Sequence, residues 1–448
     1  MARLPSHRIA GLYLAQRTRF GMKFGLATMQ ALLEEMGQPE RAFPSLLVAG
    51  TNGKGSVAAY CDSVLRASGL RVGRYTSPHL VRVNERITVS GREISAAAFG
   101  RAVRAVRAAA TRLVARGRLD AHPTFFEVLT AAAFAHFRAQ RVDVAVLEVG
   151  LGGRLDATNV VLPLASAIVN IDFDHEVYLG RTLAAIAAEK AGVMRRARAT
   201  VIGPVSAEVR SALRTRARAT GARLVDATQG ARILATPNGV ELRTPARLYR
   251  GLRPLPGAHQ RANLLVAIRL LEAARDAGLP VKLAAVPEAI ARTRWPGRLE
   301  HVAGDPPLVL DGAHNPAGAR ALAAHLRAGP PFVLVFAAMA DKDVAGLAQA
   351  LFPLAKAVVL TQPHVSRAVS PGELARRCGR LASGAERVPS VFRALARARR
   401  LARLRPGTVV VVAGSLFLVG AVEAILERER KRAPLVSRGR VRRRRSAG

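Results

Sequence analysis

A glycine-rich segment near the N-terminus has the composition of a phosphate-binding loop. The apolar residues 46–49 run into GTNGKGS at residues 50–56, and a helical pattern continues to Ala67. A strand, a glycine turn and a helix N-terminus direct backbone N–H groups and the helix dipole toward an anion, and Lys54 adds a full positive charge. The spacing differs from the standard phosphate loop, and Gly55 stands where Ser or Thr usually follows the lysine. We predict a nucleotide-phosphate site on a variant of that loop.

Polar side chains that could hold a metal follow three other apolar runs. Ser77 comes just after one run, Glu148 lies near the end of a second, and His175 follows a third. Hydroxyl and carboxylate oxygens suit a divalent cation that also binds phosphate, whereas histidine is unusual for magnesium. Two alternatives stay open: Glu148 could pair with a nearby arginine, and His175 could cap the next helix.

These side chains need a sheet whose strand ends meet at one edge, and the apolar patterning predicts one. Short apolar runs alternate with long helical stretches rich in Ala, Leu and Arg. Most runs are apolar throughout, as expected for parallel strands covered on both faces. The expected fold class is therefore α/β with a doubly wound parallel sheet. The predicted strands are residues 46–49, 72–75, 142–149, 167–171, 308–310, 332–336, 357–360 and 409–412.

The length of the chain and a helix-breaking Pro-Gly sequence within it predict two domains. A single hydrophobic core rarely extends over 448 residues. A helical stretch stops at the Trp-Pro-Gly sequence of residues 295–297, and a new strand–helix series follows. We predict a first domain at residues 1–297, more irregular and β-containing at residues 200–256, and a second at residues 298–433. The Arg-rich residues 434–448 are predicted to be a disordered tail.

The chain is strongly positive, with 69 Lys and Arg against 31 Asp and Glu and a formal net charge of +38. This balance raises the alternative of a nucleic-acid-binding NTPase. However, Arg is scattered through Ala-rich helical stretches, and only 4% of the residues are aromatic, which is too few for base-stacking platforms. We expect anionic small molecules as partners rather than nucleic acid.

The remaining composition argues against metal–thiolate, secreted and membrane classes. Cys61 and Cys378 lie far apart and support neither a disulfide framework nor a zinc site. The N-terminal residues lack the continuous apolar core of a secretory signal. The longest apolar run, residues 409–422, is interrupted by Gly and Ser and is short for a membrane span. We expect a cytoplasmic protein without a membrane partner.

A series of motifs in a fixed order carries a family resemblance. The motifs are GTNGKGS, TSPHL with ERI following, TFFEVLT, LEVGLGGRLDATNV, DHEVYLGRTLAAIAAEKAG, GAHQRAN, WPGRLE, LDGAHNP, DKD and GSLFLVG. Together they resemble folylpolyglutamate synthase/dihydrofolate synthase, a branch of the Mur ligase superfamily. The GTNGKGS form of the loop is the family's own, which accounts for its departure from the standard pattern.

The resemblance implies a Mur-ligase-type ATPase domain followed by a smaller Rossmann-like glutamate-ligase domain. The ATP-binding residues it implies are Asn52, Gly53, Lys54, Gly55, Ser56, Asn263, Arg298 and Asp311. It also implies two magnesium ions, held by Ser77, Glu148, His175 and Lys190. Lys190 would bind metal as a carbamate, although a helix-surface lysine is the ordinary alternative. His314 would lie beside the nucleotide and contribute to catalysis with Lys54 and Lys190.

The resemblance further implies a pteroate site. The substrate-binding residues it implies are Lys23, Phe24, Gly25, Thr124, Phe125, Phe126, Glu127, Leu155, Asp156 and Ala157. Phe126 could stack on the pterin ring, and Asp156 could accept its N–H donors. Within the first segment only Gly25 and the next residue closely match the family pattern. Ordinary core packing is the alternative for the two phenylalanines.

The activity implied by the resemblance is ATP-dependent addition of L-glutamate to dihydropteroate, to the glutamyl chain of reduced folates, or to both. ATP would activate the acceptor carboxylate as an acyl phosphate. A cell-wall Mur ligase is a rival, but only about 49 residues precede the phosphate loop, too few for the UDP-binding domain of such enzymes. We expect the protein to be a monomer.

Overall fold

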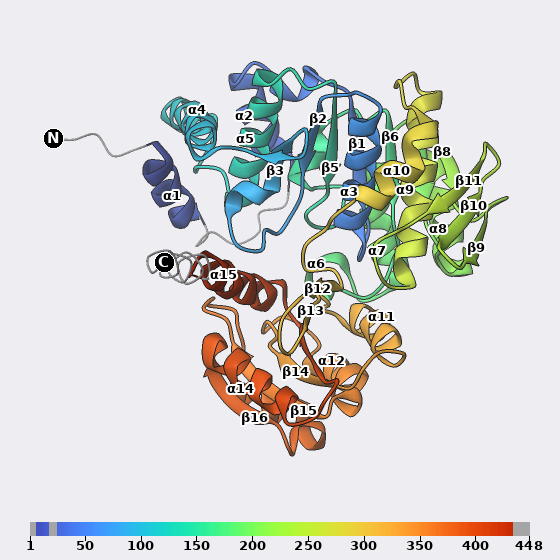
Figure 1. Cartoon of the computed structure of the whole chain (residues 1–448). Helices are drawn as coiled ribbons and strands as arrows, with labels where there is room; N and C mark the ends of the chain where they lie inside the picture. Colours follow the sequence, from blue (N-terminus) through green and yellow to red (C-terminus); the bar gives the residue numbers. More distant parts are fainter. Residues whose placement is uncertain (1–5, 18–24, 433–448) are drawn as a thin grey trace, which may run out of the picture. The chain divides into compact units, whose positions relative to one another are not determined.

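The computed structural model describes residues 6–17 and 25–432, which form two compact units. The first unit comprises the chain up to His79 together with Val83–Trp295. The second comprises Leu80–Arg82 together with the chain from Pro296 onward. Each unit is built on a sheet of its own (Figure 1).

The first unit contains an eight-stranded sheet in the order β4-β3-β2-β5-β1-β6-β7-β8. Its strands are β1 (Ser45–Ala49), β2 (Val72–Tyr75), β3 (Ile87–Val89), β4 (Arg92–Glu93), β5 (Val144–Glu148), β6 (Ala165–Ile168), β7 (Ala199–Ile202) and β8 (Arg223–Asp226). Six of them pair in parallel, but β3 pairs antiparallel with both β2 and β4. The sheet is therefore mixed rather than purely parallel, because a short connection after β2 can only return the chain antiparallel.

One predicted strand was misplaced. Residues 167–171 were predicted, but β6 ends at Ile168. The apolar pattern continues because Val169 is buried and Ile171 packs against the core beyond the last strand residue. Apolar periodicity reports burial, so it cannot locate the end of a strand whose flanking residues are buried too.

Helices cover both faces of this sheet, as the continuous apolar strands predict. Alternate β1 residues point to opposite sides: Leu47 contributes to one core cluster and Leu46 to the other. The first cluster includes residues of α2 (Ala27–Glu35), α4 (Ala96–Ala115) and α5 (Phe125–Ala139), and the second includes α3 (Lys54–Ala67), α9 (His259–Asp276) and α10 (Val286–Arg292). The other helices of the unit are α1 (Ser6–Arg17), α6 (Glu176–Leu179), α7 (Leu183–Lys190) and α8 (Ala207–Thr220).

A small antiparallel sheet completes the first unit. It has the order β11-β10-β9, formed by β9 (Arg232–Thr236), β10 (Gly239–Arg243) and β11 (Leu248–Leu252). It lies within residues 200–256, where the sequence predicted an irregular β-containing segment. The long helix α8 in the same region is amphipathic, with Val209, Leu213 and Ala217 buried.

The second unit has a six-stranded sheet in the order β12-β13-β17-β14-β15-β16. Its strands are β12 (Glu300–Val302), β13 (Leu308–Leu310), β14 (Phe332–Phe336), β15 (Ala357–Gln362), β16 (Glu386–Ser390) and β17 (Val409–Ala413). Only β12 pairs antiparallel. The covering helices are α11 (Pro316–Leu326), α12 (Val344–Leu351) and α13 (Pro371–Cys378) on one core cluster, and α14 (Val391–Arg403) and α15 (Leu416–Arg432) on the other.

Short 3-10 turns connect several of these elements. They are η1 (Pro39–Arg41), η2 (Val83–Arg86), η3 (Ala157–Val160), η4 (Ala191–Val193), η5 (Leu283–Ala285), η6 (Phe352–Leu354) and η7 (Gly379–Ala382). Among the described residues, no helix has both the length and the apolar character required to cross a membrane.

Candidate active site

The phosphate loop connects the buried strand β1 to α3. Gly53 has φ +80°, in the left-handed region that glycine adopts without strain. A side chain at this position would also overlap the amide of Asn263. At Gly50 (φ +146°), an added Cβ would lie 3.0 Å from Cβ of Val169. Both glycines therefore let the loop pass close to its neighbours while α3 begins with open N–H groups.

Lys54 is the first residue of α3 and folds back over the loop. Its Nζ donates to the carbonyl oxygens of Gly50 and Thr51, at 3.1 Å each. These are neutral acceptors, and a phosphate oxygen would offer a stronger, charged one. The loop thus holds the cation where the sequence placed it, beside the helix N-terminus.

The segment after β6 anchors the loop. The Asn170 Oδ1 accepts from the backbone N–H of Asn52 at 2.9 Å. The Thr51 hydroxyl lies 3.1 Å from both the carbonyl oxygen and the N–H of Asp172. Sequence reasoning missed Asn170 because it lay inside the predicted strand 167–171. A polar residue within an otherwise apolar run was the available signal.

A hydrogen-bonded chain joins the start of α3 to α9. Gln260 donates from Nε2 to the Ser56 hydroxyl at 3.2 Å, and Asn263 donates from Nδ2 to Gln260 Oε1 at 3.0 Å. All three side chains are buried. Ser56 and Asn263 were predicted and are brought together, whereas Gln260 was not predicted although it lies in the GAHQRAN motif.

Ser77 and Glu148 meet at the same sheet edge as the phosphate loop. In the strand register, Val48 lies opposite Glu148, and Tyr75 lies opposite Leu147. The backbone N–H of Ser77 donates to Glu148 Oε2 at 3.0 Å. Glu148 is only 4% exposed, so its negative charge is placed in a poorly solvated position that a cation would stabilise.

These oxygen donors fit a divalent cation that shares its coordination with phosphate and water. Among the described residues, no three His, Cys, Asp or Glu side chains form a group that could hold a metal by themselves. Magnesium retains waters and substrate phosphates, so a few protein oxygens such as those of Ser77 and Glu148 suit it. A soft-metal cage is not expected here.

His175 lies at the start of α6 in a left-handed conformation, with φ +54°. Its side chain makes no capping hydrogen bond to that helix, so the capping alternative is not what the structure shows. Its backbone N–H donates to Asp174 Oδ1 at 2.9 Å, and its Nε2 lies 3.8 Å from the same oxygen. Because Asp172 in the same loop bonds to Thr51, this histidine loop borders the phosphate loop.

Lys190 is a buried cation in the same neighbourhood. It ends α7 and is 3% exposed, and its Nζ donates to the Gly50 carbonyl at 2.9 Å. Burial, and secondarily the charge of Lys54, lowers the pKa of Lys190 to about 7, although Asp174 and Asp156 oppose the shift. The helix-surface alternative is therefore wrong for Lys190. A substantial share of its amine is neutral at neutral pH, as carbamate formation requires.

Two aromatic side chains predicted for the pteroate site lie beside this edge. The Phe126 ring packs against the Tyr75 ring, with centroids 6.0 Å apart, and a Cβ on Gly150 would lie 2.5 Å from Phe126 Cζ. The Arg86 guanidinium lies 5.4 Å from the Phe125 ring centroid. Both phenylalanines are partly buried and pack against the core, so packing and ligand contact are compatible here.

The polar residues predicted beside them already serve the fold. Thr124 and Glu127 form a capping box at the start of α5, with hydrogen bonds of 2.7 and 3.3 Å. Asp156 accepts from the N–H of Leu151 and from the N–H and hydroxyl of Thr158. Burial raises the pKa of Asp156, although these hydrogen bonds oppose the shift.

The remaining residues predicted for the pteroate site are less informative. Leu155 is half-buried and Ala157 is buried, both next to the turn that Asp156 organises. Gly25 has φ +137°. Lys23 and Phe24 lie outside the described residues.

The second unit brings together the other three predicted residues. The Asp311 carboxylate accepts from the N–H groups of Leu299 and Ala313, each at 2.9 Å. His314 Nδ1 lies 2.8 Å from the Gly312 carbonyl, which can only accept, so Nδ1 carries a proton in this contact. Arg298 donates from Nη1 to the Gly297 carbonyl at 3.0 Å. These contacts organise the first residues of the unit around the end of β13.

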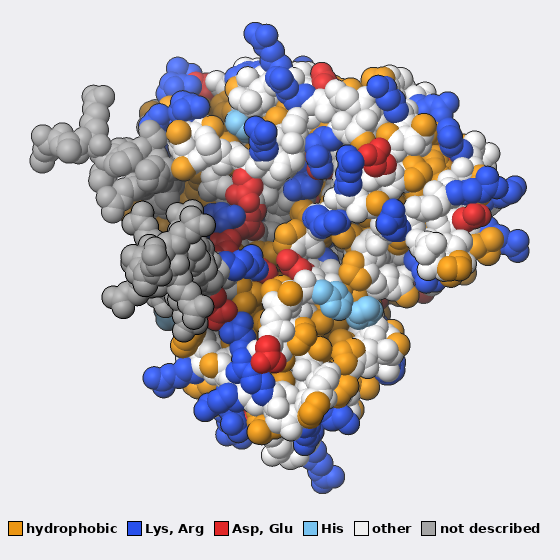
Figure 2. Space-filling model, viewed as in Figure 1, with side chains coloured by type: hydrophobic (Ala, Val, Ile, Leu, Met, Phe, Trp, Pro, Cys, Tyr) orange, Lys and Arg blue, Asp and Glu red, His pale blue; other side chains and the backbone are white. Residues whose placement is uncertain are grey.

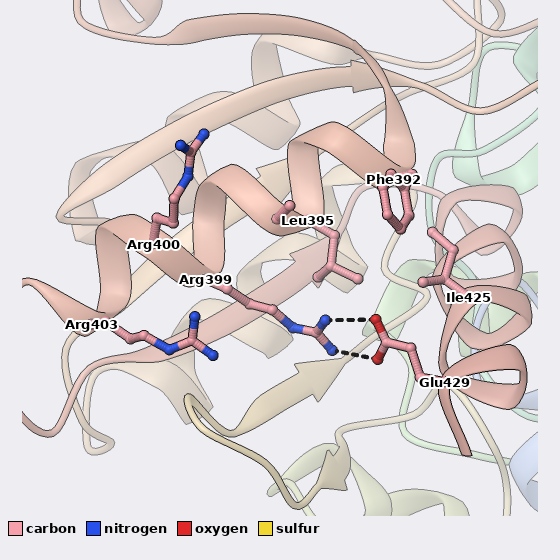
Figure 3. Close-up of a pocket in the computed structure, with 8 residues that line it drawn as sticks. Phe392, Leu395, Arg399, Arg400, Arg403, Ile425 and Glu429 are labelled. Atoms are coloured by element: carbon pink, nitrogen blue, oxygen red, sulfur yellow. Dashed lines mark hydrogen bonds and ion pairs between the residues drawn. The ribbon is translucent and has the colours of Figure 1, made fainter. Parts of the chain in front are cut away.

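The positive charge is distributed, and part of it is paired. On the face shown in Figure 2, Lys and Arg side chains are spread widely among apolar and acidic ones. A surface pocket of about 290 Å³ between α14 and α15 is lined by Arg399, Arg400 and Arg403, among other residues (Figure 3). The Arg399 guanidinium donates to both carboxylate oxygens of Glu429, at 2.8 and 3.0 Å, so its charge is paired. None of the predicted site residues lines this pocket.

Comparisons with known proteins agree with this geometry. The Mur ligase middle domain matches residues 48–271, and the Mur ligase glutamate ligase domain matches residues 297–416. The structure of Mycobacterium tuberculosis folylpolyglutamate synthase complexed with ADP superposes with a TM-score of 0.87 at 34% identity, covering 94% of this chain and 98% of that one. The chain belongs to the folylpolyglutamate synthase/dihydrofolate synthase family of Mur ligases. The predicted family and fold class are thereby confirmed.

Two further relatives bear on function. A bifunctional folylpolyglutamate synthase/dihydrofolate synthase solved with Mn, AMPPNP and L-glutamate bound matches at a TM-score of 0.83 and 31% identity, covering 93% of this chain and 98% of that one. A probable bifunctional folylpolyglutamate synthase/dihydropteroate synthase of Halobacterium salinarum is 38% identical over 92% of this chain. The chain spans about half the length of that relative, 50% of it.

Proposed function

We propose that the protein joins L-glutamate to a folate-type carboxylate at the expense of ATP, with dihydropteroate, the glutamyl chain of reduced folates, or both as acceptor. The observation that carries the proposal is the convergence at one sheet edge of Lys54 and Lys190, which share the Gly50 carbonyl, with the Ser77–Glu148 pair. A cationic lysine, a second, buried lysine and a buried carboxylate around a glycine loop suit a nucleoside triphosphate with a divalent metal. The relatives solved with ADP, and with Mn, AMPPNP and L-glutamate, support the same assignment.

The residues of the first unit would activate the acceptor carboxylate. Backbone N–H groups at the start of α3 and the Lys54 ammonium bind the phosphates and neutralise the charge that develops as the γ-phosphoryl group passes to a carboxylate oxygen. ADP leaves and an acyl phosphate forms. Ser77 and Glu148 would hold magnesium, which would supply further neutralisation of the phosphate oxygens.

The second step forms the amide. The neutral amine of glutamate attacks the acyl carbon, the C–N bond forms, the C–O bond to phosphate breaks, and phosphate and a proton leave. Phe125 and Phe126 would hold the flat pterin ring on the acceptor side. We assign ATP contacts in the second unit to Arg298, Asp311 and His314.

Three finer assignments belong to the same proposal. Two magnesium ions would bind, one through Ser77 and Glu148 with His175 nearby and one through a carbamate on Lys190. A carbamate would convert a buried cation into a two-oxygen anionic ligand, and the lowered pKa of Lys190 favours the neutral amine that reacts with CO2. We also propose a monomer, which light scattering on the purified chain would check.

The test offers the purified chain ATP, magnesium and labelled glutamate, with dihydropteroate in one reaction and tetrahydrofolate in another. Labelled product in both establishes both activities, and product in one names the acceptor. Lys54→Ala should abolish product, while Lys282→Ala, an exposed lysine of the same unit, should leave it unchanged. Absence of product from a folded, ATP-binding protein in both reactions would refute the proposed function.

A further inference from the structure

The only tryptophan of the chain, Trp295, lies against the phosphate loop. A Cβ added to Gly55 would be 2.7 Å from Cζ2 of the Trp295 ring and 3.0 Å from Cε2 and Nε1. Real Cβ atoms do not approach a ring this closely, because the repulsive wall begins well outside that distance. Residue 55 is therefore glycine because the indole fills the space that its side chain would need. Standard phosphate loops carry a serine or threonine hydroxyl at this position.

The same indole also contacts the strand that leads to Ser77. The Arg74 guanidinium of β2 lies 4.9 Å from the Trp295 ring centroid, within cation–π range. Arg74 donates from Nη1 to Asp62 Oδ2 at 3.3 Å, and Asp62 belongs to α3. Ser77 follows Arg74 by three residues. Trp295, Arg74 and Asp62 thus join the helix that starts at the phosphate loop to the strand that ends before the Ser77–Glu148 pair.

We propose that Trp295 is a positioning residue for the nucleotide site. Its ring sets the first turn of α3 by filling the space beside Gly55, and through Arg74 it fixes the end of β2, two residues before Ser77. This inference rests on the proposed binding of ATP phosphates at residues 50–56, but not on the identity of the acceptor. It explains why the loop lysine is followed by glycine, since any side chain at residue 55 would displace the ring. The site would then take its metal-binding hydroxyl from Ser77, in the segment after β2.

The test is a double-mutant cycle on ADP binding, measured by calorimetry with magnesium and without folate or glutamate. Gly55→Ala alone should weaken binding by about one to two orders of magnitude, because the added Cβ would lie 2.7 Å from Trp295 Cζ2 and the ring or the first turn of α3 would have to shift. Trp295→Leu alone should weaken it less. In the double variant the smaller side chain leaves room for the new methyl group, so ADP should bind more tightly than to Gly55→Ala. If the two losses simply multiply, the indole does not act on residue 55 and the proposal fails.

Two further measurements keep the result decisive if Gly55→Ala does not fold. Trp295→Phe keeps a ring beside Arg74 and should bind ADP more tightly than Trp295→Leu; equal affinities of the two would overturn the role of the ring. In the unaltered protein, ADP should change the emission of Trp295, and the same addition to Lys54→Ala should not. An unchanged emission on saturation with ADP would also overturn the proposal. If the variants show this coupling but the protein makes no folate product, the proposed function is wrong and the positioning role of Trp295 still holds.

Discussion

Removing the Asp62 carboxylate should destabilise the first unit more than any ordinary surface change. Its side chain is 1% exposed, and its Oδ2 lies 3.1 Å from Arg66 Nε and 3.3 Å from Arg74 Nη1. Burial lowers the pKa of Arg74, and the largest opposing influence is the charge of Asp62. Asp62→Ala would therefore leave a largely buried guanidinium without its main counter-charge.

The expected loss is about 3–5 kcal/mol, the usual cost of removing one partner of a buried ion pair. That is a large share of the roughly 5–15 kcal/mol by which domains are stable. Asp62→Asn keeps the size of the side chain and loses only its charge, so about 1.5–3 kcal/mol is expected. Removing both charges with Arg74→Met in the Asp62→Ala background should recover part of the loss, since no unpaired charge then remains in the pair.

The assay is urea unfolding followed by the emission of Trp295. Because Trp295 is the only tryptophan and lies in the same unit as Asp62 and Arg74, its signal reports that unit even if the two units unfold separately. The control is Glu288→Ala, which removes the exposed pair with Arg292 and should cost less than about 1 kcal/mol. If Asp62→Ala unfolds at the same urea concentration as this control, the buried pair does not stabilise the unit and the reasoning is wrong.

Four other predictions can be checked on the same preparations. Glu148→Gln keeps the shape of the buried side chain but removes its charge, so labelled-glutamate ligation should fall at least a hundredfold while circular dichroism stays unchanged. The folded-state pKa of Lys190, about 7, lies below its unfolded value of about 10.5, so the unfolded chain binds more protons between these pH values. The free energy of unfolding should therefore rise with pH from about 7 to about 10.5, and Lys190→Met should lose that rise in urea titrations. A Cβ at Gly420 would overlap the Leu80 carbonyl, so Gly420→Ala should lower the melting temperature of the second unit in calorimetry. A chain lacking residues 434–448 should retain ligation, and loss of turnover would mean that the basic tail takes part.

The sequence alone predicted those features of this protein that are formed by one continuous segment of the chain. The strand, glycine turn and helix at residues 46–67 were predictable because a phosphate loop is one uninterrupted segment whose glycines and lysine have defined conformational and electrostatic roles. The apolar strands at residues 308–310, 332–336 and 409–412 were predictable for the same reason, since continuous burial on both faces leaves a continuous apolar run. The polar strand ends then indicated one sheet edge, and the structure places Ser77 and Glu148 there.

Contacts between distant segments were decided only by the tertiary structure. The family motif singles out Lys190, but composition and periodicity around it do not show that it reaches the Gly50 carbonyl and loses most of its basicity. Its pKa depends on burial and on Lys54, 136 positions earlier in the chain. Likewise, neither Gly55 nor Trp295 indicates by itself that the two are in contact. Sequence patterns carry the conformational and hydrophobic preferences of neighbouring residues, whereas dielectric environment, packing volume and long-range hydrogen bonds exist only once the sheet has brought its strand ends together.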